Sequence, residues 1–406
     1  MTSSHPSSED GEDGGYSCVG GVSRPLLGRW RGGSSRAVKT GETSTAEPPK
    51  SPDSAPPSPG HRPRRRRIRV APFKIPLKRR LQTAAVLFHE FTIPLYISLF
   101  WFLLAIPLTW PILVPYLLYC LFSNAHVNGS SPQRRSHFLR RLPIWRLYTG
   151  YFPMKLHKST DLDPRRNYIF TYHPHGIISH GAFGHFCTER TTGFETLFPG
   201  ITTTLLTLDT NFRVPFYRDY LLSMGLASVS RRSCEALLRG APSGRAITIV
   251  LGGAQESLEA APGRMALILK RRRGFLKIAI RENVGVVPVL SFGENELYEQ
   301  VVPHRGGLLE WVQRAMKRVA GFTVPLFHAR GVFNYDVGLM PYRRAVNTVV
   351  GCPVFPRARV EDPRDDDVDE LQGRYIAELQ RLWETHKEEY AKDRIPGPEG
   401  EMMFIG

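Results

Sequence analysis

Residues 168–180 read Tyr-Ile-Phe-Thr-Tyr-His-Pro-His-Gly-Ile-Ile-Ser-His. The apolar start predicts a buried strand, and Pro174 and Gly176 predict a tight turn directly after it. In α/β folds, a turn at the carboxyl end of a strand is where a ligand meets the protein. Imidazole is also the side chain best suited to take a proton near neutral pH. We therefore expect His173 or His175 to be a general base, and we favour His175 because it adjoins Gly176, where a substrate can approach closely.

A metal site is one alternative for this histidine-rich stretch. No carboxylate lies among its histidines, and their spacing fits no zinc pattern. We therefore place a metal site well below a general base. Another alternative, for any single histidine, is a structural role that satisfies the backbone of the turn. The four histidines concerned are His173, His175, His180 and His185.

The chain from Tyr148 onward has the pattern of an α/β domain in which strands and helices alternate. This order predicts a mostly parallel sheet with flanking helices. One predicted helix begins with a capping serine at Ser230, and another stops near Gly285. Besides the strand at 168–172, the predicted strands are Ile201–Leu208, Ala246–Leu251 and Val286–Leu290, and the predicted helices are Ser230–Leu238, Gly274–Asn283 and Asp365–Lys392.

An apolar block precedes this domain, and it has no charged side chain from Phe91 to Phe122. One straight helix over this block would be about 48 Å long, whereas a hydrocarbon core is about 30 Å thick. Prolines near the middle predict a break into two short helices folded as a membrane-embedded hairpin. Basic residues flank both sides, so we expect both ends on the cytosolic face. The three prolines are Pro107, Pro111 and Pro115. A buried core helix is the alternative.

The chain has 406 residues and a formal net charge of +17, which favours an anionic partner. Its five cysteines form no CxxC pair, so we expect free thiols facing a reducing compartment. The first residues are rich in Ser, Gly, Pro and charge, which predicts disorder. The expected division is a disordered basic tail (1–80), a hydrophobic membrane hairpin (81–125), an α/β domain (126–392) and a C-terminal tail (393–406).

A second candidate segment, Gly252-Gly-Ala-Gln-Glu-Ser257, follows the strand predicted at 246–251. Its two glycines, Gly252 and Gly253, let backbone N–H groups approach a ligand oxygen. Glu256 is the carboxylate that we expect to orient an imidazole and to stabilise its protonated form. A glutamate in a surface loop is the alternative.

A third candidate is the basic cluster Lys270-Arg-Arg-Arg273, which opens the helix predicted at 274–283. Helix N-termini and arginine side chains both favour phosphate, so this cluster is our candidate site for an anionic cofactor. A solvated charged surface is the usual explanation for such runs. A fourth segment, Phe292-Gly-Glu-Asn-Glu296, gathers two carboxylates and an amide after another strand. The chain has no GxSxG elbow, P-loop or GxGxxG motif, which disfavours serine hydrolase and nucleotide chemistry.

Six motifs in a fixed order resemble the type 2 diacylglycerol O-acyltransferase family, and the resemblance covers about Leu81 to Tyr390. The motifs are Tyr151-Phe-Pro153, His173-Pro-His-Gly176, Phe198-Pro-Gly200, Gly252-Gly-Ala-Gln-Glu-Ser257, Arg273-Gly-Phe-Leu-Lys-Ile-Ala279 and Phe292-Gly-Glu-Asn-Glu296. The lipid-contact pattern FLxLxxxN of the family has no clean counterpart here. Related glycerol-phosphate acyltransferases pair a histidine with an aspartate five positions on. Positions 178 and 180 are Ile and His in this chain, so Glu256 is our candidate partner.

The resemblance implies a glycerolipid acyltransferase-like fold and acyl transfer from acyl-CoA to diacylglycerol, with no metal or covalent intermediate. It also implies an endoplasmic reticulum membrane protein with its catalytic domain facing the cytosol, present at lipid droplets. The residues expected to bind substrate are Pro174, Gly176, Asn211, Gly252, Gly253, Arg271, Arg273, Gly274, Phe275, Lys277, Glu294, Asn295 and Glu296.

Three alternatives stay open. The acceptor could be monoacylglycerol or a long-chain alcohol. The chain could be a membrane-anchored binding protein without activity, or a hydrolase. Because the basic residues gather in the tail, around the hairpin and at 270–273, we expect membrane lipid and acyl-CoA as partners and no nucleic acid. Self-association into a homo-oligomer is also open.

Overall fold

The computed structural model describes residues 69–72, 74–188, 190–300 and 327–405. Most of the tail predicted for residues 1–80 lies outside these ranges. Regular structure in the described part begins with helix α1 (Leu77–Glu90), slightly before the predicted end of the tail. Residues 402–405, which we expected in a C-terminal tail, form strand β11 (Met402–Ile405).

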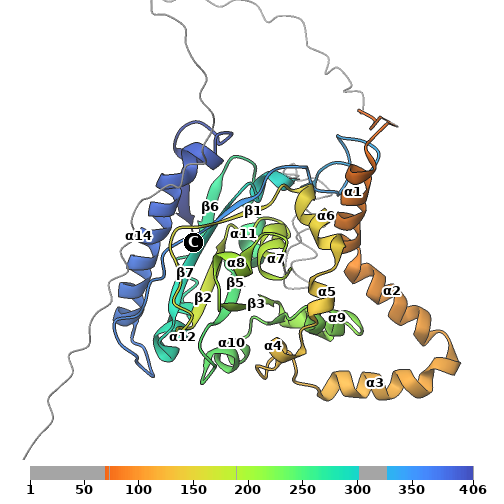
Figure 1. Cartoon of the computed structure of the whole chain (residues 1–406), viewed down its shortest axis with the longest axis horizontal. Coiled ribbons are helices and arrows are strands. Elements are labelled where there is room, and N and C mark those ends of the chain that lie inside the picture. Colours follow the sequence, from red (N-terminus) through yellow and green to blue (C-terminus); the bar gives the residue numbers. More distant parts are fainter. Residues whose placement is uncertain (1–68, 73, 189, 301–326, 406) are drawn as a thin grey trace, which may run out of the picture. The chain divides into compact units, whose positions relative to one another are not determined.

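A mostly parallel seven-stranded sheet forms the centre of the α/β domain (Figure 1). Its order is β1-β10-β7-β2-β5-β3-β4, and β10 pairs with β7 in the antiparallel sense while the other neighbours pair in parallel. The prediction of a mostly parallel sheet is therefore confirmed. The strands are β1 (Lys155–Lys158), β2 (Tyr168–His173), β3 (Thr202–Thr207), β4 (Ala227–Ser228), β5 (Arg245–Val250), β7 (Gly285–Phe292) and β10 (Asn347–Val350).

Two small sheets accompany the main one. Strand β11 pairs in parallel with β6 (Met265–Ile268), and β8 (Glu299–Gln300) pairs in the antiparallel sense with β9 (Phe327–His328). These short strands were not predicted, because strands of two to four residues carry too little period-2 pattern to be recognised.

Side-chain alternation along β2 divides the core into two layers. Tyr168, Phe170 and Tyr172 belong to one apolar cluster, and Ile169 belongs to the other. Helices α6 and α7 cover the first face, and α10, α12 and α14 cover the second (Figure 1). Their bounds are α6 (Pro143–Tyr151), α7 (His180–Phe186), α10 (Arg231–Leu238), α12 (Gly274–Glu282) and α14 (Asp365–Tyr390). Both faces of β2 and β7 are buried, which explains their continuous apolar sequences.

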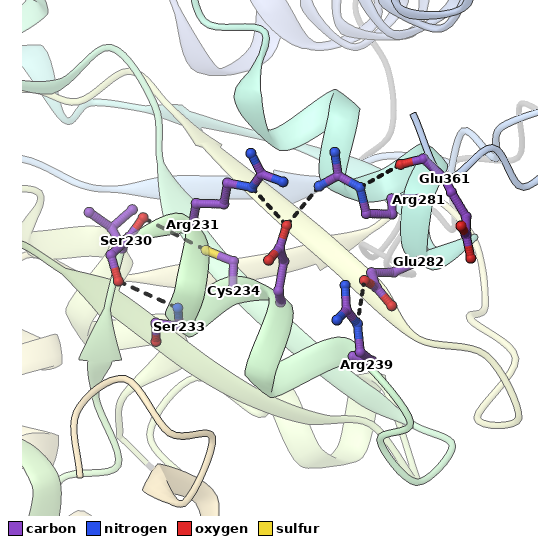
Figure 2. A network of polar contacts seen from close by, with 10 residues as sticks. Ser230, Arg231, Ser233, Cys234, Arg239, Arg281, Glu282 and Glu361 are labelled. Atoms are coloured by element: carbon purple, nitrogen blue, oxygen red, sulfur yellow. Dashed lines mark hydrogen bonds and ion pairs between the residues drawn. The ribbon is translucent and has the colours of Figure 1, made fainter. Parts of the chain in front are cut away.

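The capping serine predicted for α10 is confirmed, and α12 ends at Glu282, close to the stop predicted near Gly285. The Ser230 side chain accepts a hydrogen bond from the Ser233 N–H at the start of α10, and Asn283 ends α12 in the left-handed conformation. Arg281 of α12 forms an ion pair with Glu235 of α10 at 2.7 Å. Figure 2 shows Arg281 beside Glu361, whose carbonyl accepts from the Arg281 Nε. Polar contacts thus join the two helices at their outer edge.

Three apolar helical segments precede the domain: α2 (Thr92–Leu104), the 3-10 turn η1 (Pro107–Thr109) and α3 (Trp110–Phe122). The break predicted at Pro107 is confirmed, but Pro115 lies inside α3 rather than interrupting it. Large apolar side chains are exposed along both helices, including Phe102, Ile112 and Phe122. In the described part of the chain, no helix is by itself long and apolar enough to cross a membrane; only α1 and α2 together, bent by 58°, meet that criterion.

The remaining described helices are short: α4 (Ser131–Arg134), α5 (His137–Arg140), α8 (Phe194–Leu197), α9 (Tyr217–Ser223) and α11 (Gly253–Ser257), with the 3-10 turns η2 (Asp209–Arg213), η3 (Asn295–Leu297) and η4 (Pro398–Gly400). Cys120, Cys187 and Cys234 are free thiols.

Candidate active site

The His-Pro-His-Gly turn leaves the carboxyl end of β2, between β5 and β7. The His173–Pro174 peptide bond is cis, and Gly176 has a φ of +58°. A Cβ atom at Gly176 would lie 2.8 Å from the Cγ of Glu294, so glycine is required by both conformation and space. The turn therefore occupies the expected position at the centre of the sheet's carboxyl edge.

His175 is the half-buried histidine of this turn. Its Nδ1 lies 2.9 Å from the Ser257 hydroxyl and 3.2 Å from the Gly176 carbonyl. A carbonyl can only accept, so this contact favours the tautomer with the proton on Nδ1. Among the described residues Nε2 has no hydrogen-bond partner, and it keeps a lone pair that can accept a substrate proton. Burial lowers the pKa of His175, and the nearby charge of Arg272 also lowers it, so the ring is neutral at neutral pH.

His173 points to the other face of the sheet and is fully buried. Its Nε2 lies 2.7 Å from the Tyr375 hydroxyl of α14, and that hydroxyl also contacts Thr171 at 2.8 Å. Burial lowers the pKa of His173 to about 3. The ring is enclosed by the core, which gives His173 a structural role beneath the turn.

Glu256 contacts the same turn, but through its backbone. Its Oε1 accepts from the His175 N–H at 2.6 Å, and its Oε2 accepts from the Ile268 N–H of β6 at 2.8 Å. Our expectation that Glu256 orients the imidazole is wrong, because both oxygens are occupied by backbone donors. Burial raises the pKa of Glu256 to about 7, and the two N–H groups oppose that shift. Glu256 is therefore a clamp that joins the His-Pro-His-Gly turn to β6.

The two glycines before Glu256 have backbone conformations that favour glycine. Gly252 has a φ of +87°, and a Cβ atom there would lie 2.2 Å from the Glu256 Oε2. Gly253 has a φ of +66° and begins α11. The Gly252 carbonyl accepts from the Arg272 Nη2 at 2.8 Å, which fixes this loop from the other side. The glycines thus lie where we expected them, beside the His-Pro-His-Gly turn.

Glu294 is the second buried carboxylate at this edge of the sheet. Its Oε2 accepts from the Tyr172 hydroxyl at 2.8 Å and from the Gly181 N–H at 2.9 Å. Burial raises its pKa to about 7. The other predicted residues of this segment point elsewhere: Asn295 donates to the Arg264 carbonyl, and Glu296 accepts from the Gly263 N–H. We expected substrate contacts here, and the structure gives these three residues protein partners.

The basic segment divides into paired and unpaired side chains. Arg273 forms ion pairs with Asp365 and Asp369 of α14, and Lys277 lies 3.5 Å from Asp365. In the described ranges, Lys270 and Arg271 form no ion pair, and both are exposed. The cationic side chains available to an anionic cosubstrate are therefore fewer than we expected.

Three more residues predicted to contact substrate lie in different parts of the structure. Phe275 is buried, and its ring packs against Tyr375 at 5.6 Å, so it belongs to the core rather than to a binding surface. Gly274 begins α12 with open space around it. Asn211 lies in η2 after β3, where its amide donates to the Thr207 hydroxyl at 2.8 Å.

A buried hydrogen-bond network around His180 was not predicted. The His180 Nδ1 lies 2.8 Å from the Tyr148 hydroxyl, and the His180 Nε2 lies 2.7 Å from the Tyr298 hydroxyl. The Tyr298 hydroxyl donates to Glu90 at 3.1 Å. Both ring nitrogens are occupied, and burial lowers the pKa of His180 well below its ordinary value. The histidines weighed as metal ligands thus point in different directions, and within the described ranges no three His, Cys, Asp or Glu side chains form a group that could hold a metal ion.

A cavity beneath α7 lies away from this turn. Its lining includes His185, Phe186, Phe198 and the first residues of β3, so it is located at the amino end of that strand. Because none of its lining residues belongs to the His-Pro-His-Gly turn, we do not assign it to the reaction.

Residues 102–395 match the family model described as diacylglycerol acyltransferase. Diacylglycerol O-acyltransferase 2B from Umbelopsis ramanniana is 47% identical over 81% of this chain and 94% of its own length. Diacylglycerol O-acyltransferase 2 from Dictyostelium discoideum is 43% identical over 79% of this chain and 96% of its own. 2-Acylglycerol O-acyltransferase 1 from Bos taurus is 44% identical over 80% of this chain and 96% of its own.

Proposed function

The chain belongs to the diacylglycerol acyltransferase family and is an acyltransferase, and we propose that it transfers an acyl group from acyl-CoA to the free hydroxyl of diacylglycerol. The observation that carries the proposal is the geometry of His175. Its ring is neutral, its Nδ1 is held by Ser257 and the Gly176 carbonyl, and its Nε2 is unoccupied among the described residues.

In the proposed reaction, the His175 Nε2 takes the proton of the acceptor hydroxyl as that oxygen attacks the thioester carbonyl carbon. The C–O bond forms, and the C–S bond then breaks. The departing sulfur takes the proton from the imidazolium, so the products are the ester and free coenzyme A. Backbone N–H groups at Gly252 and Gly253 are our candidates for stabilising the developing oxyanion.

Glu256 supports this role without touching the ring. Its carboxylate fixes the His175 N–H and therefore the position of the main chain that carries the imidazole. Such positioning reduces the reorganisation that is needed when the acceptor arrives. His173 supports the turn from below through Tyr375.

Binding of the phosphates of coenzyme A is assigned to Lys270 and Arg271. Both side chains are exposed and free of ion pairs in the described part of the chain, whereas Arg273 and Lys277 are paired with α14. We expect no separate cofactor, because acyl-CoA supplies the reacting group itself.

Membrane association is proposed through α2 and α3. Large apolar side chains remain exposed along both helices, among them Trp101 at 61% and Leu121 at 75%. Exposed apolar surface of this extent is typical of a membrane contact. We propose the endoplasmic reticulum membrane, with the catalytic domain facing the cytosol, and the surface of lipid droplets as its locations.

Monoacylglycerol is the second candidate acceptor, because a protein named 2-acylglycerol O-acyltransferase 1 is as similar to this chain as the diacylglycerol enzymes are. The experiment expresses the chain in a host that lacks storage lipid, supplies its membranes with labelled acyl-CoA and each acceptor, and separates the lipid classes. We expect label in triacylglycerol with diacylglycerol as acceptor. Label found only in diacylglycerol, in wax ester or in free fatty acid would contradict diacylglycerol as the acceptor.

A further inference from the structure

Arg218 of α9 is a buried cation with no ion-pair partner among the residues that the structure describes. Arg218 is only 1% exposed. Its Nη1 donates to the Cys120 carbonyl in the last turn of α3 at 2.5 Å. Its Nε and Nη2 have no hydrogen-bond partner among the described residues. An unpaired buried charge is costly, so a buried arginine is normally matched by an anion.

The neighbouring carboxylates are already engaged. Asp219 accepts a 2.5 Å hydrogen bond from the Tyr116 hydroxyl of α3. Asp209 lies 3.2 Å from His126 and 3.7 Å from Arg213. The protein therefore supplies no anion to Arg218 in the described part of the chain.

The direction of the guanidinium is fixed by the junction between α3 and α9. The Phe216 N–H donates to the Tyr116 hydroxyl at 2.6 Å, and the two rings stack with centroids 4.8 Å apart. Nη1 is held by the Cys120 carbonyl. The opposite edge of the guanidinium, which carries Nε and Nη2, is therefore the edge that can bind a ligand. That edge is the planar fork that binds a phosphate through two parallel hydrogen bonds.

The surroundings of the guanidinium indicate which kind of phosphate compound binds there. The Tyr119 ring lies over the Arg218 guanidinium, 5.6 Å from its central carbon, and Tyr119 is 47% exposed. Leu121 and Phe122 follow in the same helix and are each 75% exposed. A tyrosine beside exposed apolar residues is typical of the boundary between hydrocarbon and lipid headgroups.

We propose that Arg218 binds the phosphodiester of a membrane phospholipid through its Nε and Nη2, with the acyl chains of that lipid along α3. The inference rests on the proposed membrane association and adds a specific headgroup site to it. The bound phosphate neutralises the buried cation and fastens the end of α3 to the catalytic domain. This site is separate from the His-Pro-His-Gly turn.

The test uses the full chain purified in a maltoside detergent. Short-chain phosphatidylcholine is added in one arm, a glucosyldiacylglycerol with the same acyl chains in the second, and inorganic phosphate in the third, and the thermal unfolding midpoint is followed. We expect the phospholipid alone to raise the midpoint. An equal rise with the phosphate-free lipid, or a rise with inorganic phosphate at the same concentration, would overturn the proposal.

Variants identify the residue. Arg218→Gln and Arg218→Lys should weaken the phospholipid response at least about tenfold in concentration, because lysine lacks the planar fork. Arg213→Gln is the matched control, since Arg213 is an arginine of the preceding turn η2 whose side chain is 77% exposed. An unchanged response in Arg218→Gln would disprove the assignment. If the Arg218 variants do not fold, the three wild-type arms can still overturn the proposal. Acyl transfer is measured separately, so its failure leaves the lipid response interpretable.

Discussion

The backbone N–H of His175 donates to the carboxylate of Glu256 at 2.6 Å, across 81 positions of sequence. The same carboxylate accepts from Ile268 of β6. One buried side chain therefore joins the turn after β2 to a strand outside the main sheet. This relationship makes Glu256 a positioning residue for the proposed base.

Glu256→Gln should weaken both the fold and catalysis. An amide has only one acceptor oxygen, so its NH2 group would face one of the two N–H donors and leave it unpaired. We expect the free energy of unfolding to fall by about 1–3 kcal/mol, and kcat to fall with little change in the KM for acyl-CoA. Denaturant unfolding and initial rates measure both. Glu259→Gln, at an exposed neighbour, is the control; equal kcat values in the two variants would refute the positioning role.

The two histidines of the turn should fail in different ways. His175→Ala removes the proposed base, so we expect kcat to fall by roughly 10²–10⁴-fold with a nearly unchanged unfolding midpoint. His173→Ala removes a buried ring and leaves the Tyr375 hydroxyl without that partner, so we expect lower stability. Rates and unfolding curves on the same preparations separate these effects. Near-normal acyl transfer by His175→Ala would exclude it as the base.

Deletion of residues 402–406 should reduce catalysis although none of them lies in the turn. Strand β11 pairs with β6, and the Ile268 N–H of β6 donates to Glu256. Without β11, we expect β6 to lose order and the Glu256 clamp to loosen. The readouts are kcat and the unfolding midpoint. Met403→Thr, a side-chain change at an exposed position of the same strand, should leave kcat unchanged. Full activity of the truncated chain would contradict the coupling.

The sequence allowed good prediction of elements whose pattern is local. The buried strands β2, β5 and β7 have continuous apolar sequences, and Ser230 is a recognisable helix cap. The glycines at 176 and 252 were also predictable as close approaches, since only glycine tolerates their backbone conformations without strain.

Contacts between distant segments could not be predicted in the same way. The partner of Glu256 is the main chain of His175 rather than its ring, which depends on how β5 and β2 are aligned. The pairing of Arg273 with α14 depends on where that helix packs. Strand alternation does place Thr171 and His173 on one face, and it was the signal that could have identified His173 as a core residue.

His185 should make the protein sensitive to acid. Burial lowers its pKa to about 3, and the charge of His157 adds to this shift. The unfolded chain binds a proton near pH 6.5, so between about 6.5 and 3 it holds more protons than the folded chain, and stability falls as the pH falls. At pH 5 the loss is about 2 kcal/mol for this group. In His185→Leu we expect that part of the pH dependence to disappear, measured by denaturant unfolding at pH 7.5 and 5. An identical pH dependence in both proteins would show that His185 does not contribute.

The ion pairs of Glu235 in α10 give the last prediction, because Glu235 pairs with one arginine of its own helix and with one of α12. Arg281 and Arg231 both contact Glu235, but the Arg281 side chain is 13% exposed and the Arg231 side chain is 71% exposed. Exposed ion pairs contribute little because water and salt screen them, whereas a partly buried pair is screened less. We expect Arg281→Gln to lower the free energy of unfolding by about 1 kcal/mol, and Arg231→Gln to have a smaller effect. Both variants should keep full acyl transfer, since this cluster is remote from the His-Pro-His-Gly turn. A double-mutant cycle with Glu235→Gln measures each coupling, and equal coupling energies would contradict the role of burial.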